Sequence, residues 1–65
     1  MERREIRRTV MAHLQSIETQ RDMLEGLTGT IDTDGDPVLA SELRRYTDKL
    51  TDTLDAMYVW AGNIV

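Results

Sequence analysis

The sequence has 65 residues, a formal net charge of −4 and no cysteine. A chain of this length forms one domain at most, and it can form neither a disulfide nor a thiolate metal site. The acidic balance argues against general affinity for nucleic acid, which depends on neutralising phosphates. Because so short a chain has little apolar surface to bury by itself, we expect a partner chain to stabilise it.

The charge is unevenly distributed along the sequence. Residues 1–21 hold five arginines against three glutamates, which gives +2, whereas residues 22–65 hold nine carboxylates against three basic side chains, which gives −6. Binding of an anion by the basic N-terminal part therefore remains a hypothesis. Seven arginines against one lysine in an acidic chain fit a halophile, whose acidic surface stays soluble in salt, and equally a GC-rich genome.

The first predicted helix covers about residues 2–27. Its residues recur at alternating spacings of four and three, which is typical of one side of an α-helix. This first stripe consists of Ile6, Val10, His13, Ile17, Gln20, Leu24, Leu27 and Ile31, with polar interruptions at His13 and Gln20. Gly26 and Gly29 favour a helix end because they add permissive backbone.

Residues 28–36 are predicted to form the turn. The segment Thr-Gly-Thr-Ile-Asp-Thr-Asp-Gly-Asp contains two glycines and three aspartates, which disfavour regular structure. Because so short a connection places consecutive helices side by side in opposite directions, the sequence predicts an antiparallel helical hairpin.

The second predicted helix covers about residues 37–62. Asp36 can accept hydrogen bonds as the N-cap, and Pro37 suits the first helical position, where a missing N–H costs nothing. The second stripe consists of Leu39, Leu43, Tyr46, Leu50, Thr53, Met57, Trp60 and Ile64, and only Thr53 is outside the apolar and aromatic set. Leu54 and Ala61 widen the stripe, as expected of a helix that touches two neighbours.

These elements predict an all-α protein, a single domain over residues 1–65 that folds as a two-helix antiparallel hairpin. A lone hairpin would expose a long apolar face, so we expect a homodimer that forms a four-helix bundle. The expected core and dimer seam consists of Ile6, Val10, Ile17, Leu24, Leu39, Leu43, Tyr46, Leu50, Leu54, Met57 and Trp60.

The turn contains an incomplete calcium-loop pattern. Asp32, Asp34 and Asp36 alternate like the first three ligands of an EF-hand. Pro37 and Leu43, however, occupy the positions where that loop needs a glycine and a bidentate acid. We therefore interpret the aspartates as turn and cap residues and expect no metal.

Catalytic chemistry is not indicated. His13 is the only histidine, and no second histidine one helical turn away completes a zinc pair. No arrangement of serine, acid and glycine suggests a nucleophile, so we expect neither an enzyme nor a cofactor. No apolar run approaches the roughly 20 residues that span a bilayer, and no apolar signal-peptide core follows the basic start. We therefore expect a cytoplasmic protein that does not contact the membrane.

Four short segments carry a resemblance to a known family. They are Met11-Ala12, Met23-Leu24-Glu25-Gly26-Leu27, Ile31-Asp32-Thr33-Asp34 and the run Leu43…Asp48…Leu50. With these segments, and over nearly its full length, the chain resembles the Rop-like family of plasmid copy-number proteins. The resemblance implies a hairpin that dimerises into a four-helix bundle and binds paired RNA loops through polar residues and one exposed aromatic on the first helix. At the positions that match the RNA-binding residues of the family, Arg3 keeps a positive charge. Val10 stands in place of an amide, Leu14 in place of the exposed aromatic and Gly26 in place of a lysine.

Two functional hypotheses follow. The first is a protein–protein interaction or regulatory module, since a wide apolar stripe is present without a catalytic constellation. The alternative is a Rop-like RNA-binding dimer. Its anion contacts would be Arg3, Arg4, Arg7 and Arg8, which occupy two adjacent ridges of the first helix.

Overall fold

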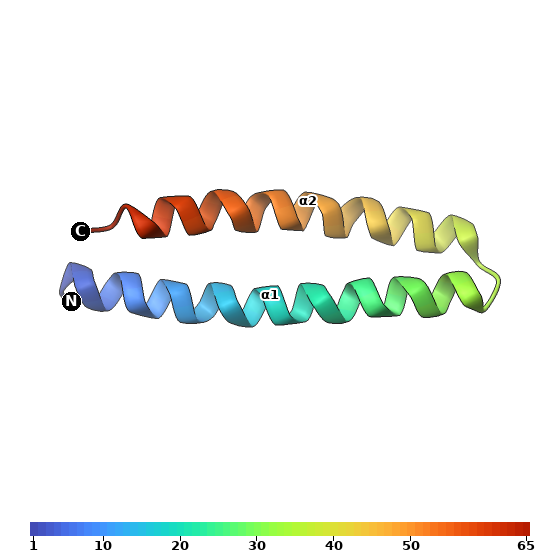
Figure 1. Ribbon diagram of the computed structural model, residues 1–65, viewed down its shortest axis with the longest axis horizontal. Helices are drawn as coiled ribbons and strands as arrows, with labels where there is room; N and C mark the ends of the chain where they lie inside the picture. The colour runs from blue at the N-terminus through green and yellow to red at the C-terminus, as the bar shows by residue number, and fades with distance from the viewer.

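The computed structural model covers residues 1–65 and contains two helices, α1 (Arg3–Thr33) and α2 (Pro37–Gly62), and no strand. The helices lie side by side and run in opposite directions, so both chain ends lie opposite the turn (Figure 1). The predicted all-α helical hairpin is confirmed. It measures 50 × 15 × 12 Å and is therefore a long, flat pair of helices with two broad faces. Neither helix contains an apolar stretch long enough to cross a membrane.

The turn is shorter than the predicted segment 28–36. Helix α1 continues past residue 27 to Thr33, and only residues 34–36 lie between the helices. The prediction was wrong because a glycine inside a helix costs only about 1 kcal/mol relative to alanine. The extra turns of α1 bury Thr28 against α2 and half-bury Ile31. The chain reverses instead at Gly35, whose φ of 95° lies in the left-handed region that favours glycine.

The predicted start of α2 is confirmed. A side-chain oxygen of Asp36 accepts a hydrogen bond from the backbone N–H of Leu39 at 3.2 Å, and Pro37 occupies the first helical position. This cap satisfies one of the backbone donors that the first turn of a helix leaves without a partner.

The helices meet along one row of residues on each helix, spaced seven apart, which we call the contact line. On α2 it consists of Ala40, Thr47, Leu54 and Ala61, all buried. On α1 it consists of Leu14, Arg21 and Thr28, of which Leu14 and Thr28 are buried and Arg21 is half-buried. Only six of the 65 residues are buried, so the hairpin has a very small core of its own.

The contact line is not the stripe that the sequence predicts as the seam. Of those seam residues only Leu54 is buried, and Ile6, Val10, Leu24, Leu43 and Leu50 are half-buried. Ile17, Leu39, Tyr46, Met57 and Trp60 are exposed. As contacts between the two helices, the assignments of Leu39, Tyr46 and Trp60 are wrong, because the smaller side chains one position further along α2 face α1. Ile17 and Met57 lie beside the contact line and are 38% and 37% exposed. The place of all five in a dimer seam stays a prediction.

Candidate functional site

The two broad faces of the hairpin differ in chemistry. On one face, Arg21 Nη1 donates a hydrogen bond to Thr51 Oγ1 at 3.4 Å, and Tyr58 Oη donates to Glu18 Oε2 at 2.7 Å. These bonds cross from α1 to α2 on the same side of the contact line. We call this side the polar face.

The remaining side of the contact line is the apolar face. Adjacent residues of a helix are rotated by about 100° around its axis. Residues three positions after each contact-line residue therefore lie on the side of the contact line away from the polar face. Its inner rows are Val10, Ile17, Leu24 and Ile31 on α1 and Leu43, Leu50, Met57 and Ile64 on α2. Its outer rows are Ile6, His13, Gln20 and Leu27 on α1 and Leu39, Tyr46, Thr53 and Trp60 on α2. Both stripes found in the sequence therefore lie on this one face.

The apolar face is exposed along the whole hairpin. Tyr46 and Trp60 are both 58% exposed, and Leu39 and Leu27 are about half exposed. The face extends over the 50 Å length of the hairpin. Monomeric proteins rarely expose contiguous apolar patches larger than a few hundred Å². The apolar face is therefore the main candidate functional surface of the molecule.

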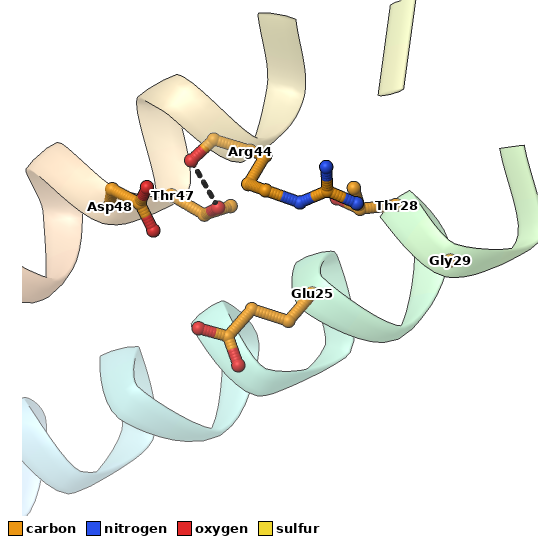
Figure 2. A pocket seen from close by; sticks show the side chains of 6 residues that line it. All are labelled: Glu25, Thr28, Gly29, Arg44, Thr47 and Asp48. Carbon is orange, nitrogen blue, oxygen red and sulfur yellow. Dashed lines mark hydrogen bonds between the residues drawn. The ribbon is translucent and has the colours of Figure 1, made fainter. Parts of the chain in front are cut away.

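A notch of about 300 Å³ opens on the polar face near the turn (Figure 2). Glu25, Thr28, Gly29, Arg44, Thr47 and Asp48 line it. The Thr47 hydroxyl donates to the carbonyl oxygen of Arg44, and the Thr28 hydroxyl donates to that of Leu24, both at 2.9 Å. Every buried side-chain polar atom in the protein has a hydrogen-bond partner. The notch thus lies over the small side chains Thr28 and Thr47 of the contact line, whose hydroxyl groups are both hydrogen-bonded.

The polar face carries one charged network at mid-length. Arg21 lies 2.9 Å from Asp22, 3.8 Å from Glu18 and 3.9 Å from Glu25, measured between guanidinium nitrogens and carboxylate oxygens. The hydrogen bond to Asp22 is the main reason that the pKa of Arg21 is raised above its ordinary value. Sequence reasoning missed this residue, although the spacing of Leu14, Arg21 and Thr28 contains the signal.

Tyr58 belongs to the same network. Its hydrogen bond to the Glu18 carboxylate raises the pKa of the phenol above its ordinary value, and desolvation adds to this effect. The bond joins residues 40 positions apart and so ties the C-terminal half of α2 to α1. Arg21 and Tyr58 thus each donate a hydrogen bond across the two helices on the polar face.

The four N-terminal arginines lie at the open end of the hairpin. Arg4 and Arg7 line two shallow concavities, one of about 400 Å³ shared with Arg8 and one of about 220 Å³ beside Ile64 and Val65. Arg3 is placed differently, because it precedes Val10 by seven residues and so continues an inner row of the apolar face. None of the four forms an ion pair within the chain.

The remaining candidate residues stay apart. His13 is exposed in an outer row of the apolar face. Asp36 caps α2, and Asp32 and Asp34 lie at the end of α1 and in the turn. No group of three or more histidine or carboxylate side chains is positioned to hold a metal ion.

Comparison with known proteins found no relative of this chain. No family model matches the sequence, and no curated protein or solved structure is similar enough to indicate a shared family. The Rop-like relationship therefore stays a prediction.

Proposed function

We propose that this protein is a small interaction module of a regulatory kind, and that its apolar face joins two copies into a homodimeric four-helix bundle. The observation that supports the proposal is the exposure of both apolar stripes on one face of the hairpin. A second hairpin placed on this face would turn a two-helix layer into a bundle with a continuous core.

The size of the face supports a dimer. Stable protein–protein interfaces bury about 800 Å² on each partner, and an apolar face that runs the full 50 Å length of the hairpin offers an extended surface for one. Two-fold symmetry is the commonest way for identical chains to cover such a surface. The polar face, with its crossing hydrogen bonds and ion pairs, would remain in contact with solvent or with another protein.

Measuring the mass in solution tests the proposal. We expect light scattering to give about 15 kDa, twice the chain mass of 7.5 kDa, at micromolar concentrations. Tyr46→Glu places a charge on the apolar face and should give monomers, because an unpaired buried charge is costly. Val59→Glu is the matched control, since Val59 is 68% exposed on α2 but lies outside the apolar face. A fully helical monomer at tens of micromolar would refute the proposal.

A second candidate function is RNA binding through the open end. It is favoured by the gathering of Arg4, Arg7 and Arg8 around one concavity without intramolecular ion pairs. Binding that depends on phosphate contacts should weaken steeply as salt rises. A gel-shift series with structured RNA across salt concentrations, repeated with Arg4→Gln/Arg7→Gln, distinguishes this candidate. Absence of any shift at low salt would eliminate it.

A further inference from the structure

The larger of the two concavities at the open end belongs to the polar face. It has a volume of about 400 Å³ and is lined by Arg4, Arg7, Arg8, Met11 and Gly62, and we call it the basic concavity. Arg4, Met11 and Glu18 are spaced seven apart on α1, so the first two continue the polar-face row of Glu18. Arg8 continues the row of Asp22 in the same way. A dimer formed through the apolar face would therefore leave the basic concavity open.

The positive charge of the basic concavity is not compensated. Its three guanidinium groups are the only charged groups that line it, and none of the three arginines forms an ion pair within the chain. Glu2 and Glu5, the nearest carboxylates in the sequence, are not among the lining residues. Like charges that share one space repel each other, so an anion placed between them removes an unfavourable interaction.

The room in the basic concavity depends on the end of α2. Gly62 is the last residue of this helix, and a methyl group added there would have no atom within 4 Å. Met11, on the other helix, is half-buried and packs against the cluster of Leu14, Leu54 and Ala61. The concavity is therefore bounded by a packed side chain on α1 and has no side chain on α2, and a long side chain at position 62 would occupy it.

Beyond the open end the polar face is acidic. Glu18, Asp22 and Glu25 lie around Arg21 on α1, and Asp48 lines the notch near the turn. Affinity for a nucleic acid depends on neutralising many phosphates along an extended backbone. Such a backbone would meet these carboxylates once it passed the first turns of α1. The charge distribution therefore favours a compact anion over an extended one.

Arginine suits phosphate oxygens, because its planar guanidinium donates two parallel hydrogen bonds. Three such groups around one space can bind more oxygen atoms than a single phosphate group has, and a diphosphate supplies them. We propose that the basic concavity binds a compact polyanion of the diphosphate class, either the free ion or the diphosphate of a nucleotide. This site is independent of the proposed dimer, since each hairpin contains all five residues that line it.

Calorimetric titration with inorganic pyrophosphate tests the site. We expect one ion per chain, bound more tightly than inorganic phosphate and less tightly as salt rises. Arg4→Gln and Arg8→Gln should each raise the dissociation constant about 10-fold, the usual scale for losing a hydrogen bond to a charged group. Arg3→Gln makes the same charge change on the apolar face and should have a much smaller effect. No binding at low salt, or equal effects of the three substitutions, would overturn the proposal.

Gly62→Met tests the position of the ligand without changing the charge. The longer side chain should fill the basic concavity and raise the dissociation constant for pyrophosphate about 10-fold, because it keeps the ion from at least one arginine. Gly62→Ala is the control and should bind as the wild type does, since a methyl group meets no atom there. Circular dichroism verifies that both variants keep their helices. Unchanged binding by a fully helical Gly62→Met would overturn the site.

Two further titrations distinguish the sources of the diphosphate. Adenosine diphosphate that binds no more tightly than pyrophosphate identifies the free ion as sufficient, and tighter binding identifies a nucleotide site; both results support the proposal. Binding of structured RNA without any binding of pyrophosphate would assign the arginines to RNA and overturn it. Tyr46→Glu, the expected monomer, should bind pyrophosphate as the wild type does, so failure of the proposed dimer would leave this test intact.

Discussion

Residue 54 shows how much of the hairpin depends on single side chains. Leu54 is 1% exposed, and it forms the buried cluster with Leu14 and Ala61. Thr53, the neighbouring residue, is exposed in an outer row of the apolar face. Because only six residues are buried, the loss of one of them removes a large share of the core.

We expect Leu54→Ala to lower the free energy of unfolding by about 2–5 kcal/mol, as is usual for buried leucine. Thr53→Ala should lower it far less, because Thr53 is exposed and contributes to no buried cluster. Urea unfolding followed by circular dichroism at one fixed protein concentration measures both. Equal effects of the two substitutions would show that the contact line is placed wrongly.

Tyr58 gives a pH dependence whose direction follows from its hydrogen bond. The pKa of Tyr58 is raised above its ordinary value by the bond to Glu18. A raised pKa in the folded state means that the stabilising bond is present below the unfolded pKa of about 10 and is lost as pH rises through the folded value.

We therefore expect the melting temperature to fall as the pH rises above about 10, because Tyr58 loses its proton. Tyr58→Phe should lower the melting temperature at neutral pH and make this alkaline fall smaller. Tyr46→Phe is the control, since no hydrogen bond of the Tyr46 hydroxyl is present. Identical alkaline melting curves for the wild type and Tyr58→Phe would contradict the role of the bond.

At the scale of the elements, glycines have opposite roles in α1 and in the turn. Gly26 and Gly29 lie inside α1, and a methyl group added at either would have no atom within 4 Å. Gly35 also has open space around it, but its φ of 95° is one that other residues adopt only with strain.

Gly26→Ala and Gly29→Ala should each stabilise the protein by about 0.5–1 kcal/mol, because alanine loses less conformational entropy in a helix. Gly35→Ala should destabilise it by about 1–2 kcal/mol, the cost of left-handed backbone in a residue with a Cβ. Thermal unfolding of the three variants provides the measurement. Destabilisation by Gly26→Ala would argue that α1 ends near residue 27 after all.

At the scale of the whole molecule, the apolar face makes folding and association one equilibrium in the proposed dimer. Trp60 is 58% exposed in the single hairpin, and the proposed dimer would cover it. The melting temperature of such a dimer rises with protein concentration, because association draws the unfolded chains into the folded state.

We expect the emission of Trp60, the only tryptophan, to shift to longer wavelength on dilution, as the indole becomes exposed to water. Trp60→Ala should raise the dimer dissociation constant, whereas Val59→Ala, on the same helix but outside the apolar face, should not. Sedimentation equilibrium gives the constants. A melting temperature independent of concentration over a hundredfold range would count against the dimer.

Local residue chemistry was sufficient to predict the helical hairpin and the start of α2. Asp36 before Pro37 forms the predicted cap, and α2 has the predicted bounds. The length of the turn could not be predicted in the same way. Thr28 is buried and Ile31 is half-buried in the longer α1, and this burial, which exists only in the folded chain, offsets the small cost of Gly26 and Gly29 within the helix.

The sequence by itself determined that each helix repeats every seven residues and has an apolar side. Only the tertiary structure decided which row faces the other helix. Leu39, Tyr46, Thr53 and Trp60 share their period with Ala40, Thr47, Leu54 and Ala61, and one residue step separates the two rows by about 100°. A period does not specify a direction in space, and the second row, with small side chains at Ala40, Thr47 and Ala61 and with Leu54, was the one that packed against α1. That rotation placed both apolar stripes on one exposed face.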